Sequence, residues 1–176
     1  KRETIDYYQH HTERLQHLQR AECIQAVKQL KRDGKIRYWG VSLNTFHPEP
    51  EADFLMERKL GDGFQLVLNI INQRALPLMK KVSDHGYGVI VRMPLQFGLL
   101  TGKFSKETKF GESDHRSFRL TPEILSNSID YLEEVWALAA RYGISKASFS
   151  LSFCISFSEV STVIPGIKTP EQAEVN

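Results

Sequence analysis

The chain has 176 residues, of which 41% are hydrophobic and 25% are charged, which is enough apolar material for one globular domain with a single core. A formal net charge of +2 and a sequence pI of about 8.5 give no indication of a nucleic-acid or membrane partner. Cys23 and Cys154 lie far apart and form no CxxC pair, which argues against a zinc site and favours a reducing, cytoplasmic setting. No run approaches the roughly 18 apolar residues of a membrane span.

The first half of the chain alternates short β-branched or aromatic runs with stretches of helical spacing. The predicted strands cover residues 5–9, 36–41, 64–68 and 88–92, and the predicted helices between them cover residues 21–31, 49–59 and 75–83. The first helix carries Ile24, Val27 and Leu30 at helical spacing, and Asp33-Gly34 follows where a helix commonly ends. This alternation predicts βαβ units and a parallel sheet.

The second half begins with an aperiodic segment, residues 95–120, that is rich in Gly, Ser, Lys and Thr. It exceeds the roughly 12 to 15 residues usual for a structureless connection, and long loops of this kind commonly cover ligands. Beyond it, the pattern predicts helices over 122–141 and 145–157, a fifth strand over 160–164, and a helix that starts after Thr169.

Strands in βα order suit either an open doubly wound sheet or part of a closed barrel. The chain has no GxGxxG after a predicted strand and no P-loop, so the doubly wound alternative lacks its main sequence signature. A closed barrel of this type needs eight strands and roughly 250 residues, so the chain would form only part of one.

Four ordered blocks of the sequence resemble the aldo-keto reductase family. They are GKIRYWGVS at residues 34–42, FQLVLNIINQR at 64–74, VIVRMPLQFGLLTGKF at 89–104 and TVIPGIKTPEQAEVN at 162–176. The resemblance implies an α/β fold, the (β/α)₈ TIM barrel, with residues 1–176 forming a single domain that covers roughly strands 4 to 8. It also places the active site at the C-terminal ends of the strands, as the general rule for such barrels does.

By this resemblance, His11 matches the catalytic histidine that hydrogen-bonds the substrate carbonyl beside a tyrosine. The neighbouring His10 is the alternative if the match shifts by one residue. The family's catalytic Tyr, Lys and Asp belong to strands and loops that precede Lys1. The chain also starts without a Met or a signal peptide, so we expect the natural N-terminus to lie upstream and the 176 residues alone to be inactive.

The resemblance also implies a set of NADP(H)-binding residues. These are Ser42, Gln65, Arg92, Leu95, Gly98, Lys103, Gly166, Lys168, Gln172 and Asn176. The family uses the matching Ser and Gln to hold the nicotinamide amide, the loop from Leu95 to cross the pyrophosphate, and the segment from Lys168 to receive the adenosine 2′-phosphate and adenine. A lysine at the start of a helix is also a physically favourable place for a phosphate.

The chain departs from the family pattern at several of these positions. Leu43 follows Ser42 where members often have Asn, and Gln172 stands where they often have Arg. Arg92 replaces a tyrosine that in many members stacks on the nicotinamide. Its guanidinium group can preserve that stacking or form a salt bridge in the barrel mouth. Asp114, His115 and Arg116 are expected to order the long loop or to clasp it over the cofactor.

The sequence therefore predicts an NADP(H)-dependent oxidoreductase that reduces aldehydes or ketones by hydride transfer. Its expected partner is a small carbonyl substrate, with neither nucleic acid nor membrane, and its oligomeric state is left open. One alternative is a nicotinamide-binding regulatory protein of the same fold with weak or no turnover. Another is a different barrel enzyme, such as a phosphate-binding isomerase or aldolase, which requires only similarity of fold.

Overall fold

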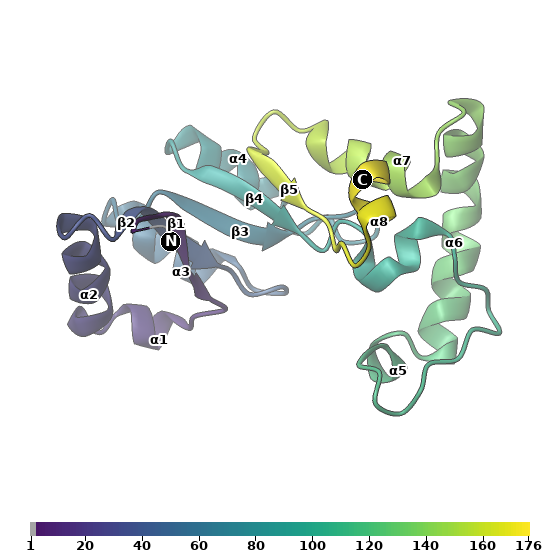
Figure 1. Ribbon diagram of the computed structural model, residues 1–176, viewed down its shortest axis with the longest axis horizontal. Coiled ribbons are helices and arrows are strands. Elements are labelled where there is room, and N and C mark those ends of the chain that lie inside the picture. The colour runs from purple at the N-terminus through teal and green to yellow at the C-terminus, as the bar shows by residue number, and fades with distance from the viewer. Residues whose placement is uncertain (1–2) are drawn as a thin grey trace.

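The computed structural model describes residues 3–176 and shows one parallel sheet. Its strands are β1 (Ile5–His11), β2 (Ile36–Ser42), β3 (Gly63–Val67), β4 (Gly88–Arg92) and β5 (Thr162–Ile164), arranged in the order β1-β2-β3-β4-β5 (Figure 1). A doubly wound sheet reverses its strand order at a switch point, and no reversal occurs between these strands. The described part of the chain is thus α/β, a half-barrel consistent with part of a (β/α)₈ barrel.

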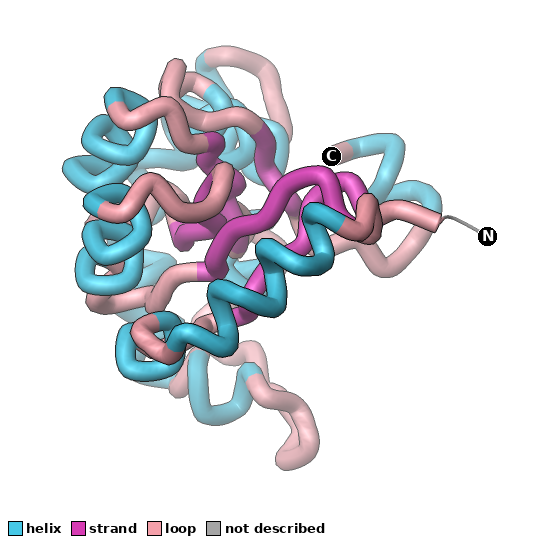
Figure 2. Tube along the Cα trace, turned by 90° about the vertical axis from the view of Figure 1, so that its left-hand side faces the viewer, coloured by secondary structure: helices cyan, strands magenta, loops and turns pink. Residues whose placement is uncertain are grey.

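Helices cover the outer face of this sheet, which Figure 2 shows as a stack of helices beside the strands. They include α2 (Ala21–Arg32), α3 (Glu49–Glu57) and α4 (Leu76–Asp84). Alternate strand residues such as Val41, Phe64 and Val89 are fully buried in one core with Val27 of α2 and Val82 of α4. Side chains of a strand alternate between its two faces, so the other set faces the inside of the barrel.

A second apolar cluster lies beyond β4 and holds the later elements in place. It joins η1 (Gln96–Thr101), a 3₁₀ helix, to α6 (Pro122–Arg141) through Leu99, Leu100, Leu125 and Leu132. The helix α7 (Lys146–Ile155) packs on η1 as well, where the Ser150 hydroxyl donates to the carbonyl oxygen of Leu100 at 3.1 Å. The helix α8 (Pro170–Val175) follows β5.

The predicted strands and helices are confirmed with boundaries shifted by a few residues, but three details were wrong. The helix α1 (Leu15–Leu18) was not predicted, and residues 95–120 contain η1 and α5 (Arg116–Arg119) instead of being structureless. Both α1 and α5 have four residues, too few to show a helical period. The last strand starts at Thr162 and not at residue 160; just before it, the Ser161 backbone N–H donates to the carbonyl oxygen of Val89 and the Ser161 hydroxyl accepts from the backbone N–H of Val89.

Candidate functional site

Three of the predicted site residues form a row across adjacent strands, two of them at the C-terminal ends of their strands and Gln65 in the middle of β3. His11 ends β1 and pairs in register with Ser42, which ends β2, and Ser42 pairs in turn with Gln65 of β3. The Ser42 hydroxyl donates a hydrogen bond to Gln65 Oε1 at 3.2 Å. Ser42 is buried, Gln65 half-buried and His11 exposed. The bond from Ser42 orients the Gln65 amide and leaves its Nε2 group to donate to a ligand oxygen.

The adjacent His10 lies on the opposite, helix-covered face of the sheet. Its ring contacts Trp39 edge-on, with ring centroids 5.9 Å apart, and Tyr8 in the same manner at 5.7 Å. Its Nδ1 lies 4.0 Å from a carboxylate oxygen of Glu13. His10 is therefore engaged in packing behind the sheet, and the structure places His11, not His10, in the row with Ser42.

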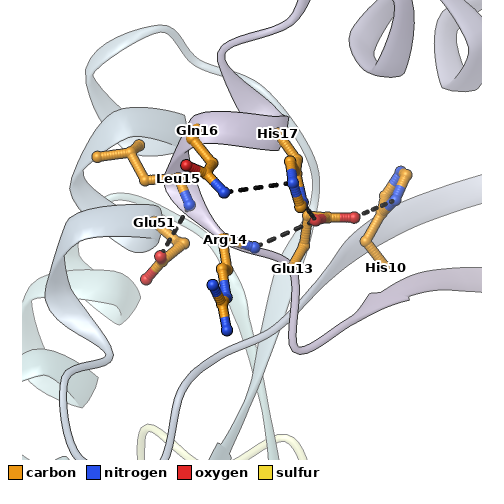
Figure 3. A network of polar contacts seen from close by, with 7 residues as sticks. All are labelled: His10, Glu13, Arg14, Leu15, Gln16, His17 and Glu51. Atoms are coloured by element: carbon orange, nitrogen blue, oxygen red, sulfur yellow. Dashed lines mark hydrogen bonds and ion pairs between the residues drawn. The ribbon is translucent and has the colours of Figure 1, made fainter.

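The turn that follows His11 is fixed by a polar network, which Figure 3 shows from close by. Glu13 Oε1 accepts a hydrogen bond from the backbone N–H of Arg14 at 3.1 Å and lies 2.6 Å from His17 Nδ1. Burial alone would raise the pKa of Glu13, but its bonds to His17 and Arg14 outweigh that effect and hold the pKa below its ordinary value. The backbone N–H of Leu15 donates to Glu51 of α3 at 3.0 Å, which ties α1 to the outer helices.

Arg92 lies at the end of β4 and reaches across the end of β3. Its Nη2 group donates to the carbonyl oxygen of Leu43 and to the Thr45 hydroxyl, both at 3.2 Å, and its Nη1 group lies 3.5 Å from Met93 Sδ. Burial lowers the pKa of Arg92. Within residues 3–176 it forms no ion pair, so neither of the two roles considered for it, stacking on a ring or a salt bridge, is filled by the protein itself.

The remaining predicted cofactor residues line one cleft of about 1160 Å³. Segments that are far apart in the sequence form it: η1 and the loop after it on one side, and the chain from the end of β5 into α8 on the other. The predicted residues among its walls are Leu95, Gly98, Lys103, Gly166, Lys168, Gln172 and Asn176. His11, Ser42, Gln65 and Arg92 are not among the residues that line it, although Met93, which follows Arg92 directly, is. The site thus has a row at the strand ends and an adjoining cleft.

The long loop forms a further wall of this cleft, with residues that the sequence did not single out as ligand contacts. Arg116 binds both carboxylate oxygens of Asp114 and lies 4.8 Å over the ring of Phe110. The ring of Phe97 meets His115 edge-on at 5.3 Å. Residues 97–119 contain four phenylalanines, joined by Arg116 and Arg119 near the end of the segment, and this combination was the available signal that the loop is ordered.

Asn69 holds two residues of the cleft wall, Met93 and Gln96, in place. Its Nδ2 group donates to the carbonyl oxygen of Met93 at 2.9 Å and to Gln96 Oε1 at 3.0 Å, and its Oδ1 accepts from the backbone N–H groups of Ile71 and Asn72. The side chain is fully buried, with both of its amide hydrogens and its oxygen in use. Asn69 is therefore a structural residue that joins the end of β3 to the start of η1.

On the other side of the cleft, the start of α8 is stabilised by its own side chains. The backbone N–H of Gln172 donates to the Thr169 hydroxyl at 3.3 Å, and the backbone N–H of Lys168 donates to Gln172 Oε1 at 2.7 Å. This reciprocal arrangement resembles a capping box. It orients Gln172 and leaves the Lys168 ammonium group exposed at the cleft.

The residues of the cleft fit a dinucleotide with anionic phosphates. The volume exceeds the roughly 300–1,000 Å³ of a site for a drug-sized molecule. Gly98, in the wall of the cleft, has a φ of +92°, a conformation that residues with a side chain rarely adopt. Lys103 and Lys168 bring positive charge to two sides of the cleft.

The sequence profile of the Aldo/keto reductase family matches residues 1–176. The chain belongs to this family. Among curated aldo/keto reductase relatives, the NADH-specific methylglyoxal reductase of Escherichia coli is 26% identical over 162 residues, which are 89% of this chain and 47% of the relative. A Schizosaccharomyces pombe protein provisionally named voltage-gated potassium channel subunit beta is 29% identical over 169 residues, with 88% of this chain and 48% of the relative covered.

A solved structure shows the same fold. The glycerol dehydrogenase from Gluconobacter oxydans superposes with a TM-score of 0.73 at 27% identity, over 97% of this chain and 52% of that one. The chain therefore spans about half the length of the aldo/keto reductases that it matches. This agreement supports the assignment of the half-barrel to a barrel of the aldo/keto reductase type.

Residues 3–176 contain no group of three His, Cys, Asp or Glu side chains placed to hold a metal ion. No helix among them is long and apolar enough to cross a membrane. Cys154 is buried, and its burial raises the pKa of the thiol to about 11, so it packs in the core as a neutral group.

Proposed function

We propose that this aldo/keto reductase is an NADP(H)-dependent enzyme that reduces aldehydes or ketones to alcohols. The observation that carries the proposal is the row of His11, Ser42 and Gln65, which pair in register across three adjacent strands, with His11 and Ser42 at the C-terminal ends of β1 and β2. Active sites of (β/α)₈ barrels are assembled at this end of the barrel. The adjoining cleft has the size and the lysines that a phosphorylated dinucleotide requires.

A bound reduced nicotinamide supplies the hydride that the carbonyl carbon accepts, while the carbonyl oxygen takes up a proton. The protein's part is to hold the reactants in line and to stabilise the negative charge that develops on the oxygen. His11, exposed at the end of the row, donates a hydrogen bond to that oxygen. Ser42 and Gln65 hold the carboxamide of the nicotinamide, and residues of the cleft anchor the rest of the cofactor.

The regulatory alternative is not favoured. One relative is named as a channel subunit, but another of similar identity is named as a reductase. A binding protein without turnover has no need of an imidazole at the carbonyl position, whereas His11 occupies the exposed end of the row. The experiment below separates the two proposals, because only an enzyme loses turnover without losing cofactor binding.

The test is the His11→Ala variant of the full-length protein. We expect kcat/KM for carbonyl reduction to fall by roughly two to three decades, the usual cost of losing a donor to a developing oxyanion, while the Kd for NADPH stays within about twofold. Steady-state assays with several aldehydes and a fluorescence titration of NADPH measure the two quantities.

His10→Phe is the matched control, because a phenyl ring can replace the edge-on packing of His10 on Trp39. It should retain most of the activity. Normal turnover in His11→Ala together with a large loss in His10→Phe would transfer the carbonyl contact to the neighbouring histidine. Absence of turnover in the wild type despite NADPH binding would favour the regulatory alternative.

A further inference from the structure

Arg92 brings a guanidinium group to the middle of the candidate site. The residue ends β4, where it pairs in register with Val67 of β3, yet its Nη2 group bonds the carbonyl oxygen of Leu43 beyond the end of β2. The side chain therefore spans the end of β3. Leu43 directly follows Ser42, so the guanidinium bonds the backbone immediately beyond the residue that pairs with Gln65.

No acidic side chain among residues 3–176 pairs with the charge of this group. Its hydrogen-bond acceptors are a carbonyl oxygen, a hydroxyl and the thioether of Met93, all of which are neutral. Arg92 Nε is buried and has no hydrogen-bond partner. An arginine side chain stays protonated at any physiological pH. A half-buried cation without a counter-ion, in contact with a ligand site, acts on whatever charge the ligand carries.

The nicotinamide ring changes its charge in the proposed reaction. The reduced ring is neutral, and it becomes a cation when a hydride, with its two electrons and one proton, leaves it for the carbonyl carbon. A fixed positive charge near the ring therefore repels the oxidised cofactor and leaves the reduced one unaffected. Between a cation and a ring a few ångströms apart in a partly desolvated mouth, such repulsion is worth about a factor of ten in affinity.

We propose that Arg92 makes the protein discriminate between the redox states of its cofactor, by weakening the binding of the oxidised nicotinamide relative to the reduced one. The inference rests on the proposed function, since it needs a nicotinamide at the strand ends. It assigns Arg92 an electrostatic role in promoting uptake of the reduced cofactor and release of the oxidised product. The bonds to Leu43 and Thr45 hold the guanidinium in place for this role.

The experiment is a pair of titrations of the full-length protein, with NADPH and with NADP⁺, followed by protein fluorescence or calorimetry and needing no turnover. The quantity compared is the ratio of the Kd for NADP⁺ to the Kd for NADPH. Arg92→Met removes the charge and keeps an unbranched side chain. We expect the ratio to fall about tenfold, mainly because NADP⁺ binds more tightly.

Three further variants keep the test decisive. Arg92→Tyr is also neutral and places at this position the residue that many members of the family carry, so it should lower the ratio as Arg92→Met does. Arg92→Lys retains the charge and should keep the ratio close to that of the wild type. Arg74→Met removes an exposed cation that stacks on Phe46 outside the site, and it should leave the ratio unchanged.

Equal changes in both affinities in the neutral variants would show that Arg92 only braces the loop after β2, and would overturn the inference while leaving the proposed function intact. Unchanged affinities for both cofactors would overturn it in the same way. A wild-type protein that binds neither NADPH nor NADP⁺ would overturn the proposed function and this inference together, which is a different result.

Discussion

At the scale of single residues, the site depends on which face of a strand each side chain takes. His10 and His11 are neighbours in the chain, but one packs on Trp39 behind the sheet and the other joins Ser42 at the strand ends. The cleft adds positively charged side chains, among them Lys168. Lys168 is the exposed cation where β5 leads into α8, and its ammonium group is the feature of this segment most suited to a phosphate.

Replacing Lys168 with alanine should distinguish the two nicotinamide cofactors. A charge-assisted contact to the 2′-phosphate is worth roughly 1.5 to 3 kcal/mol, so we expect the Kd for NADPH to rise by about one to two decades and the Kd for NADH to change little. Titration of the full-length variant with each cofactor measures this. Lys109→Ala, at an exposed lysine of the long loop that does not line the cleft, is the matched control. Equal losses for both cofactors would show that Lys168 does not recognise the phosphate.

At the scale of elements, the long segment after β4 is ordered by its own contacts. The guanidinium of Arg116 lies over the rings of Phe104 and Phe110. The Asp114 carboxylate accepts hydrogen bonds from both the side chain and the backbone N–H of Arg116. The side-chain hydrogen bonds from Arg116, followed by that from its backbone N–H, hold the pKa of Asp114 well below its usual range. The contact therefore stabilises the loop fully at any pH above the ordinary pKa of an aspartate. This stabilisation is lost only as the pH falls through the lowered pKa of Asp114 in the folded protein.

Asp114→Asn should loosen this loop without altering the sheet. At neutral pH we expect the Kd of NADPH to rise by roughly two- to fivefold, as is usual for an exposed ion pair, and the loop to be cleaved faster by a protease. Because wild-type Asp114 remains ionised down to strongly acidic pH, the difference between the two proteins should be constant from pH 8 to about pH 5. A difference that disappears already near pH 6 would assign the effect to another titrating group.

At the scale of the whole molecule, the described chain is a sheet with two edges. Within the part that the structure describes, β1 and β5 each have one neighbouring strand, whereas a closed barrel has no edges. Apolar side chains such as Ile5 and Tyr38 are more than half exposed. Strands that complete a barrel would cover these surfaces, as expected for a chain that spans about half the length of its relatives.

Residues 1–176 expressed alone should therefore aggregate readily and lack carbonyl reductase activity. Size-exclusion chromatography and an NADPH oxidation assay with several aldehydes measure these two properties. Sustained turnover that His11→Ala abolishes would show that the fragment carries its own proton donor, with Tyr7, Tyr8 and Tyr38 the first residues to replace. Tyr7 is the least suited of these, because burial and then the nearby Asp62 raise its pKa well above the ordinary value of a tyrosine.

The sequence by itself determined the features that depend on local periodicity. The alternation of strands and helices, the end of α2 at Asp33-Gly34 and the cap of α8 at Thr169 were predicted and are confirmed. The four family blocks identified the correct family, because they preserve residue types in a fixed order. Side-chain alternation and helical period repeat within a few residues, so they can be read without knowledge of the rest of the fold.

Only the tertiary structure decided which of these residues meet. It joined η1 to α8 across one cleft, placed His11 rather than His10 beside Ser42, and left Arg92 without a counter-ion among the described residues. It also ordered α1 and α5, single turns held by contacts with distant residues: Leu15 of α1 with Glu51, and Arg119 of α5 with the ring of Phe97. Such contacts join positions tens of residues apart and depend on how the whole βα array packs, a property that no local period of the sequence encodes.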